Sequence, residues 1–265
     1  MLEVSVIIPI HEIKENTLDL LNKAIESVDI NNKNTKQVKL YSKVICPENI
    51  SEQLKKVAKK RYEVLVNKNK TDYCTQINEA IKQIKTDYFA ILEYDDVFMP
   101  RYFKGFYEYY AVNEDVSAFL PINVFVDSET NIREFCNEIV WAKEFSKERG
   151  YIDYDCLQSF TGFNLTGGVF NKNDFETVGG YKPSIKVAFN YELLLRLTNK
   201  GYKVYVLPKE GYVHTINTKD SLTDEYAKAF SENDIKGWFD LAKCECTYIE
   251  DREKTPVNYT VNELK

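Results

Sequence analysis

Glu93, Tyr94, Asp95 and Asp96 place three carboxylates within four residues, directly after an apolar run of strand-forming residues. Carboxylates this close repel one another unless a cation neutralises them. A hard divalent ion prefers oxygen ligands and often shares its coordination sphere with substrate phosphates. The spacing therefore predicts a cradle for a metal-bound diphosphate. The alternative is a solvated turn at the end of a strand.

The elements before these acids alternate between strand and helix. Short apolar and β-branched runs predict strands at 4–8, 38–45, 62–66 and 88–92. Apolar residues at helical spacing predict helices at 18–28, 51–61 and 77–84. This alternation is typical of a parallel, doubly wound sheet, which binds ligands at the carboxyl ends of its strands. The acids follow such an end, so their place and their chemistry agree.

The second half of the chain is less regular. Its pattern predicts, in order, a strand at 117–126, a mixed or helical segment at 134–147, a compact Gly-containing segment at 159–170, a helix at 191–197, a strand at 203–207 and a helix at 226–241. The helix at 191–197 should stop at Gly201, and the strand at 203–207 should stop before Pro208. No repeat, low-complexity linker or clear domain boundary stands out.

Composition excludes several classes of protein. The 265 residues suffice for one large α/β domain or two small ones. A net charge of −6 argues against an electrostatic surface for nucleic acid. No apolar run reaches the length of an integral membrane segment. Six scattered cysteines without zinc-site spacing favour a reduced, cytoplasmic location. The 19 tyrosines suggest that some of them line a groove for sugars.

Three blocks of sequence, taken together, resemble the family 2 glycosyltransferases of the GT-A fold. In order, they are Val4–Pro9; a helix with Asn78 followed by 88–100; and 178–181 followed by 191–196, 201–204 and Pro208. The resemblance implies a mixed, mainly parallel α/β sheet flanked by helices, with a helical C-terminal extension. It also implies a nucleotide-sugar-binding half at 1–110, an acceptor-binding half at 111–218, and the extension and tail at 219–265.

The resemblance implies sugar transfer from a nucleotide-sugar donor to a glycan or other hydroxyl acceptor, with inversion, usually with Mn²⁺ or Mg²⁺. A UDP-sugar is favoured as donor, and a GDP- or dTDP-sugar is an alternative. By position, Asp95 corresponds to the main metal-binding acid and Glu93 to the first acid of the motif. Asp96 would hold sugar hydroxyls or a metal-bound water. His214 would be a third metal ligand or a diphosphate contact, against the alternative of an ordinary hydrogen-bonded histidine.

The remaining expected site residues fall into two groups. On the donor side, beside the acids and Tyr94, they are Pro9, His11, Glu12, Glu48, Asn67, Asp72 and Asn78. On the acceptor side they are Asn164, Thr166, Gly167 and Gly168, where glycine lets backbone N–H groups approach a ligand. The alternatives are packing for His11 and a tight turn for the glycines.

One departure from the family concerns the catalytic base. The family places an acid pair just before the last helix of the third block, whereas this chain has Phe189 and Asn190. An amide cannot accept the acceptor's proton, and losing a general base typically costs about 10²–10⁴-fold in rate. Either another acid serves, with Glu192 the nearest and the 110–160 segment a second source, or the enzyme is slow, or the domain only binds a nucleotide-sugar or glycan. A nucleotidyltransferase is a further alternative, but the loop after the first strand is neither Gly-rich nor basic.

Overall fold

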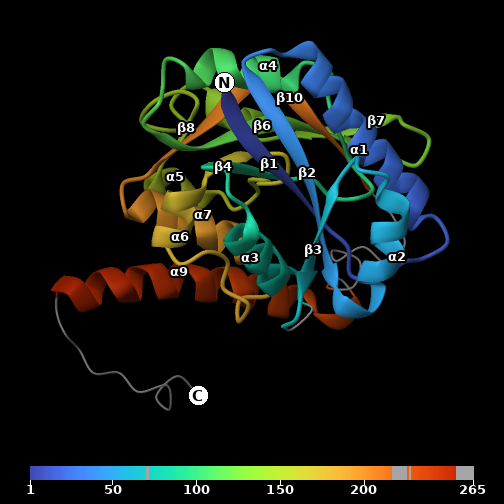
Figure 1. The fold of residues 1–265 in the computed structure, drawn as a ribbon. Coiled ribbons are helices and arrows are strands. Elements are labelled where there is room, and N and C mark those ends of the chain that lie inside the picture. The colour runs from blue at the N-terminus through green and yellow to red at the C-terminus, as the bar shows by residue number, and fades with distance from the viewer. Residues whose placement is uncertain (70–71, 217–225, 227, 255–265) are drawn as a thin grey trace.

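The computed structural model describes residues 1–69, 72–216, 226 and 228–254, with side chains described through residue 244. The expected boundary at 218–219 and the tail at 255–265 lie outside these residues. One mixed sheet with helices on both faces forms the body of the molecule (Figure 1).

The sheet has a parallel part and a mixed part. The parallel part is formed by β1 (Leu2–Pro9), β2 (Val38–Pro47), β3 (Glu63–Asn67) and β4 (Tyr88–Ile91), as the sequence predicted. The rest is formed by β5 (Val97–Phe98), β6 (Val116–Val126), β7 (Ile132–Cys136), β8 (Tyr151–Ile152), β9 (Val169–Asn171) and β10 (Lys203–Thr215). The strand order is β3-β2-β1-β4-β9-β6-β10-β5, with β7 paired to β6 and β8 to β10.

Two layers of helices cover the sheet, one on each face. The first layer is formed by α1 (Thr17–Asn34), α2 (Glu48–Ala58) and α4 (Tyr102–Tyr110). The second is formed by α3 (Tyr73–Gln83), α5 (Tyr154–Ser159), α6 (Lys172–Thr177) and α7 (Phe189–Asn199). A 3₁₀ turn spans Glu138–Trp141, and α9 (Glu232–Lys254) packs beneath α7 (Figure 1).

Each face of the sheet has its own apolar core because side chains alternate along a strand. In β1, Val4, Val6 and Ile8 pack in the α1 layer, whereas Ile7 packs in the α3 and α7 layer. Burial on both faces explains why this strand is a continuous β-branched run.

Two expectations for the second half were wrong or incomplete, and a third was left open between two alternatives. β10 does not stop before Pro208 but continues to Thr215, because register shifts between Val206 and Tyr212 form an irregularity that accommodates a residue without a backbone N–H. The helix expected at 226–241 is interrupted, since Ser231 and Asp234 cap the start of α9 reciprocally. The segment 134–147, expected to be mixed or helical, is mixed: it contains the end of β7 and the 3₁₀ turn.

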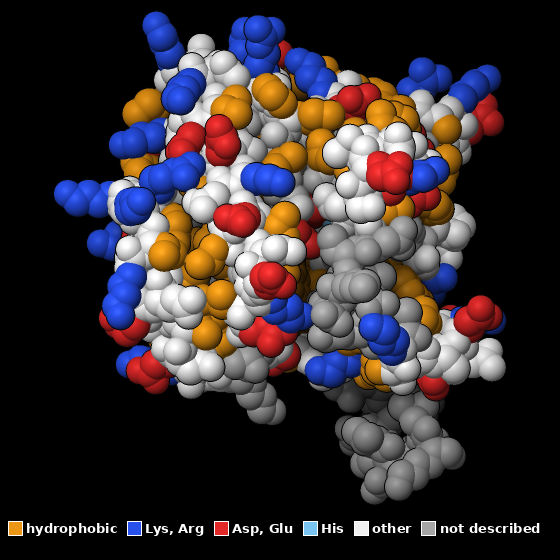
Figure 2. Space-filling model, turned by 90° about the vertical axis from the view of Figure 1, so that its right-hand side faces the viewer, with side chains coloured by type: hydrophobic (Ala, Val, Ile, Leu, Met, Phe, Trp, Pro, Cys, Tyr) orange, Lys and Arg blue, Asp and Glu red, His pale blue; other side chains and the backbone are white. Residues whose placement is uncertain are grey.

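The surface carries charges of both signs. Figure 2 shows Lys and Arg side chains mainly along the left and upper borders of one face, with acids nearer its middle and hydrophobic side chains between them. In the part of the chain that the structure describes, no helix is both long and apolar enough to cross a membrane.

Candidate functional site

Residues 93–96, the acid turn, lie at the carboxyl ends of β1 and β4, as the sequence predicted. Leu92 N–H donates to Ile7 O at 2.9 Å, which extends the parallel pairing to the turn, and Asp96 N–H donates to Glu93 O at 3.2 Å to close it. Glu93, Tyr94 and Asp95 are half-buried. The turn therefore presents two of its carboxylates at the sheet edge where doubly wound folds bind ligands.

Asp96 is held differently from its two neighbours. It is 1% exposed, and its carboxylate lies against the end of β10. Tyr212 Oη donates to Oδ2 at 2.7 Å, His214 Nδ1 lies 2.8 Å from the same oxygen, and Thr215 N–H donates to Oδ1 at 2.9 Å. With its oxygens occupied and buried, this carboxylate fastens β10 to the acid turn rather than facing a ligand.

Glu93 lies between two tyrosines. Tyr73 Oη, at the start of α3, donates to Glu93 Oε1 at 2.6 Å, and Glu93 N–H donates to Tyr212 Oη at 3.1 Å. Burial raises the pKa of Glu93 to about 8, with the charges of Asp95 and Asp96 adding to the shift and the Tyr73 hydrogen bond opposing it. The turn is thus a set of carboxylates whose mutual repulsion a cation would relieve.

His214 places an imidazole beside the acid turn, against Asp96. Burial by itself lowers its pKa, but the carboxylates of Asp96, Asp95 and Glu93 together outweigh burial, so the pKa lies above the ordinary value for histidine. Its ring also meets the edge of Phe125, with centroids 4.9 Å apart. The imidazole is therefore fixed by a carboxylate on one side and by an aromatic ring on another.

These donors fit a divalent cation that is also bound by substrate. Among the described residues, no three His, Cys, Asp or Glu side chains form a ready-made metal group. Mn²⁺ and Mg²⁺ bound with substrate phosphates need only one or two carboxylates, the other positions being filled by phosphate oxygens and water. The half-buried carboxylates of Glu93 and Asp95 supply this kind of donor.

Tyr73 belongs to an aromatic cluster that the sequence did not reveal. Its ring centroid lies 6.4 Å from that of His11, 6.4 Å from Tyr181 and 5.3 Å from Phe189. These side chains come from the β1 exit, α3, the segment between α6 and α7, and the start of α7. The one sequence signal for Tyr73 is its place in the first turn of a helix whose amino end meets the carboxyl edge of the sheet.

The other expected donor residues differ in exposure. Pro9 ends β1 and is buried, whereas His11, Glu12 and Glu48 are exposed. Glu12 pairs with Lys14 at 2.8 Å. These residues lie at the β1 exit and at the start of α2, at the carboxyl ends of β1 and β2.

Three polar residues of the expected donor site form hydrogen bonds with backbone groups. Asn67 is buried, and its Oδ1 accepts from Asn69 N–H at 2.9 Å. Asp72 caps α3 by accepting from Thr75 N–H at 3.0 Å. Asn78 donates to Tyr181 O at 2.7 Å and accepts from Tyr181 N–H at 3.0 Å. Asn78 thus fixes the turn before α7, a role in positioning rather than in direct contact.

The expected acceptor segment, residues 164–168, packs against Ile91 and Tyr212, which adjoin the acid turn. Gly167 has φ +78°, donates its N–H to Ile91 O at 2.9 Å, and leaves no room for a Cβ, which would lie 2.5 Å from the Tyr212 ring. Asn164 Oδ1 accepts from both the N–H and the Oγ1 of Thr166 at 2.9 and 2.7 Å. Gly168 is likewise buried, and a Cβ there would lie 2.6 Å from Leu120. The segment is a tight turn, as the alternative held, and it lies beside the acid turn.

The start of α7 holds an amide and a buried ion pair. Asn190 is half-buried, and its Oδ1 accepts from Tyr181 Oη at 3.0 Å. Glu192 is fully buried, contacts Arg196 through both oxygens at 2.6 Å, and pairs with Lys182 at 2.9 Å. Arg196 pairs with a structural carboxylate, as expected. Glu192, in contrast, is not open to an acceptor hydroxyl, so it is not a suitable catalytic base.

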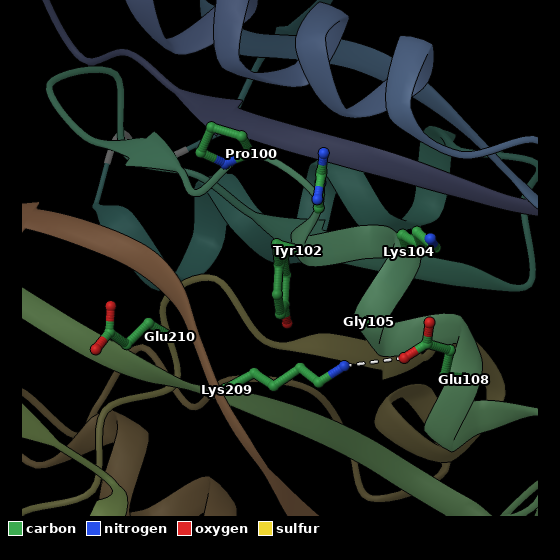
Figure 3. Close-up of a pocket in the computed structure, with 8 residues that line it drawn as sticks. Pro100, Tyr102, Lys104, Gly105, Glu108, Lys209 and Glu210 are labelled. Atoms are coloured by element: carbon green, nitrogen blue, oxygen red, sulfur yellow. Dashed lines mark hydrogen bonds and ion pairs between the residues drawn. The ribbon is translucent and has the colours of Figure 1, made fainter.

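Two surface hollows lie away from the acid turn. One of about 250 Å³ lies between the start of α4 and the middle of β10, where Lys209 Nζ pairs with Glu108 at 2.9 Å (Figure 3). The other, of about 510 Å³, lies at the amino end of β4 beside Tyr88 and Tyr110. Neither hollow is lined by the acids at 93–96. The candidate site is therefore identified by its metal-donor groups and not by the size of a surface hollow.

The family model for "Glycosyl transferase family 2" matches residues 5–166, which include most of β1 and the acid turn. The chain belongs to glycosyl transferase family 2. The third block, from 178 onward, lies beyond the matched residues. Among curated proteins, none matches the chain in sequence.

Solved structures of S. aureus TarS share the fold of this family member. TarS 1–349 in complex with UDP-GlcNAc has a TM-score of 0.64 at 13% identity and covers 91% of this chain. TarS 1–349 in complex with UDP has a TM-score of 0.59 at 12% identity and covers 92%. This chain spans 65% and 66% of those two chains, and 37% of a longer TarS chain. The likeness confirms the expected mixed, mainly parallel GT-A-like architecture.

Proposed function

We propose that this chain is a metal-assisted glycosyltransferase that moves a sugar, with inversion, from a nucleotide-sugar donor to a glycan or other hydroxyl acceptor. The observation that carries the proposal is the acid turn: Glu93 and Asp95 lie at the carboxyl end of β4 while Asp96 is fixed to β10. Family membership supports transferase chemistry over nucleotidyl transfer. The UDP-GlcNAc and UDP complexes of TarS, which share the fold, favour a UDP-sugar over a GDP- or dTDP-sugar.

Each group of side chains has a part in this proposal. Asp95 and Glu93, with His214, would hold Mn²⁺ or Mg²⁺, which when bound neutralises charge on the departing diphosphate. Tyr73 orients Glu93 through its 2.6 Å hydrogen bond. The exposed ring of His11, beside Tyr73, offers a surface on which a nucleobase can stack.

The acceptor would lie alongside the acid turn, next to Asn164 and Thr166. Gly167 joins that segment to β4 through its hydrogen bond to Ile91 O. Thr166 is half-buried at the same place, next to Asn164. Sugar hydroxyls can use such short polar side chains as donors and acceptors.

Deprotonation of the acceptor is the weak step of this site. Asn190 cannot take up a proton. The carboxylate of Glu192 is already paired with Arg196 and Lys182, so it is not open to an acceptor hydroxyl. We therefore expect turnover to be slow by about 10²–10⁴-fold relative to a site with a carboxylate base. The same observation favours a second candidate function, a domain that binds a nucleotide-sugar or glycan without transferring it.

Metal-dependent nucleotide binding tests the proposal. The thermal unfolding temperature would be measured with UDP, GDP, dTDP or CMP, each with and without Mn²⁺. We expect UDP to stabilise the wild type only when Mn²⁺ is present, and Asp95→Ala to lose this stabilisation, because ligand binding to the native state raises stability.

The control is Asp115→Ala, which removes an exposed carboxylate that pairs with Lys203. This variant should respond to UDP and Mn²⁺ as the wild type does. If no nucleotide stabilises the wild type with or without metal, the metal-diphosphate interpretation of the acid turn is wrong. If UDP does stabilise the wild type, an assay for release of UDP from UDP-sugars distinguishes a transferase from a binding domain.

A further inference from the structure

The hollow at the amino end of β4 lies outside the candidate site. Its volume of about 510 Å³ falls within the roughly 300–1,000 Å³ of small-molecule pockets. Tyr88, the first residue of β4, lines the hollow, whereas Glu93 follows the other end of the strand. At about 3.3 Å per residue, the chain from Tyr88 to Glu93 spans roughly 16 Å. A small ligand in the hollow would therefore not reach the acid turn.

Backbone pairing holds the walls of this hollow in place. β4 and β9 are antiparallel, with Tyr88 opposite Asn171. The N–H of Lys172 donates to Asp87 O at 2.8 Å, which continues the pairing beyond the strand ends. Asn171 Oδ1 accepts from Asp174 N–H at 3.1 Å and so caps α6. The hollow is thus formed without a ligand, as binding sites for small molecules usually are.

Two tyrosines give the hollow an aromatic wall. The ring centroids of Tyr88 and Tyr110 are 5.4 Å apart, with their planes at 81°. Tyr110 ends α4 and is half-buried, and its ring also packs on Phe106 and Phe119. Burial and a hydrogen bond with Tyr88 raise the pKa of Tyr110 to about 12, so its hydroxyl stays protonated. This wall offers flat apolar rings together with a polar hydroxyl, a combination that suits a sugar.

The exposed side chains of the hollow supply both donors and acceptors. They are Lys85, Asp87, Asn173 and Glu176. The half-buried Lys172 is a second cation, so the two cations and the two carboxylates cancel. A hydroxyl group both donates and accepts, which matches this mixed set. A balanced lining gives no attraction for an anion, and the hollow therefore suits an uncharged polyhydroxyl compound better than a phosphate.

The abundance of tyrosine in the sequence gains a use at this hollow. At the acid turn, the hydroxyls of Tyr73 and Tyr212 donate to carboxylates. We propose that the hollow binds a saccharide unit of a neutral glycan, packed against Tyr88 and Tyr110 and hydrogen-bonded by the surrounding polar side chains. This site goes beyond the proposed function, because it holds a glycan without acting on it and needs neither metal nor nucleotide.

Binding to immobilised neutral oligosaccharides tests the proposal. The panel is built from glucose, galactose, mannose, N-acetylglucosamine and N-acetylgalactosamine, with anionic oligosaccharides included for comparison. EDTA is present and nucleotide is left out, so that the donor site stays empty. We expect the wild type to bind at least one neutral member. Tyr110→Ala should bind that member about tenfold more weakly, the scale of one lost aromatic contact.

Tyr109→Ala is the matched control for Tyr110→Ala. Tyr109 precedes Tyr110 on α4 and is also half-buried, but it packs on Tyr205, with centroids 5.9 Å apart, and does not line the hollow. This variant should bind as the wild type does. A second test combines Asp87→Ala with Asn173→Ala, which removes two exposed polar groups of the hollow and leaves its aromatic wall intact. The double variant should fold normally and bind the same glycan more weakly.

The outcomes separate this proposal from the proposed function. The proposal is overturned if the wild type binds no neutral member, or binds anionic members in preference. Binding that is unchanged in the double variant places the glycan elsewhere and also overturns it, even if Tyr110→Ala does not fold. Stabilisation by UDP and Mn²⁺ without glycan binding would leave the proposed function standing alone. Glycan binding that depends on the hollow, without any response to nucleotides, would do the reverse.

Discussion

The acid turn and the start of α7 both contact Tyr73, but they differ in which polar groups they leave available. In the acid turn, the most buried carboxylate, Asp96, anchors the structure, and Glu93 and Asp95 are left half-buried at the sheet edge. At the start of α7, Glu192 is fully buried in ion pairs and Asn190 is an amide. The first region has kept groups that can bind charge, whereas the second has none that can accept a proton.

This difference shows that ligand binding and proton transfer depend on separate residues of the family's sequence pattern. Binding a diphosphate needs only donors and a cation, and a strand end can supply them. Proton transfer needs a carboxylate within hydrogen-bond reach of the acceptor. A change of one residue at 190 removes the second without disturbing the first.

Asn190→Asp should have the largest effect. It restores a carboxylate of the same shape beside Tyr181 Oη, which can donate to an oxygen at this position as it does now. We expect turnover to rise by about 10²–10⁴-fold, because a general base contributes on that scale. The measurement is release of UDP from UDP-sugars, with water or an added hydroxyl compound as acceptor.

Asn190→Ala serves as the control for this substitution. It removes the amide without adding a base, so turnover should stay near the wild-type rate. Equal rates for Asn190→Asp and wild type would mean that the base lies elsewhere. The contrast between the two regions would then be wrong.

Glu192→Ala should have the next largest effect, on stability. Removing this carboxylate leaves Arg196, which is 6% exposed, as a buried charge without its partner. Breaking a buried ion pair in this way costs about 3–5 kcal/mol in free energy of unfolding. Chemical denaturation measures it.

Lys182→Met is the matched comparison, since it removes the second cation from the same Glu192. The Lys182 side chain is 28% exposed, so its loss should cost much less. Near-equal stability of Glu192→Ala and wild type would contradict a structural role. Glu192 would then again be a candidate base.

The comparison of Gly167→Ala with Gly201→Ala should show the smallest of the expected effects, a difference in free energy of unfolding. Both glycines have positive φ, +78° and +80°, so an alanine is strained at either position. A Cβ at Gly167 meets the Tyr212 ring at 2.5 Å, whereas at Gly201, after α7, nothing lies within 4 Å. We expect Gly167→Ala to cost about 1–3 kcal/mol more than Gly201→Ala, the usual scale of overpacking.

The same pair also reports on the acid turn. Tyr212 contacts Glu93 and Asp96, so displacing its ring should weaken Mn²⁺-dependent stabilisation by UDP in Gly167→Ala. Gly201→Ala should respond normally, because it lies at the end of α7. If both variants respond alike, the acid turn is not coupled to the segment 164–168 through Tyr212.

The sequence by itself determined the parallel half of the sheet and the place of the acid turn. Both follow from local patterns, because burial on both faces demands the apolar run at 4–8, and the acids directly follow a buried strand, at the edge where doubly wound sheets bind ligands. Family membership confirmed the resemblance found from Val4–Pro9 and 88–100.

Only the tertiary structure decided which acids are available. Asp95 and Asp96 are neighbours of the same type, and nothing local distinguishes them. The difference comes from Tyr212, His214 and Thr215, more than a hundred residues later, because β10 continues past Pro208 and brings their donors to one carboxylate. Long-range contacts of this kind have no sequence period, which is why the partner of Asp96, like the contact between Tyr73 and Glu93, could not be predicted.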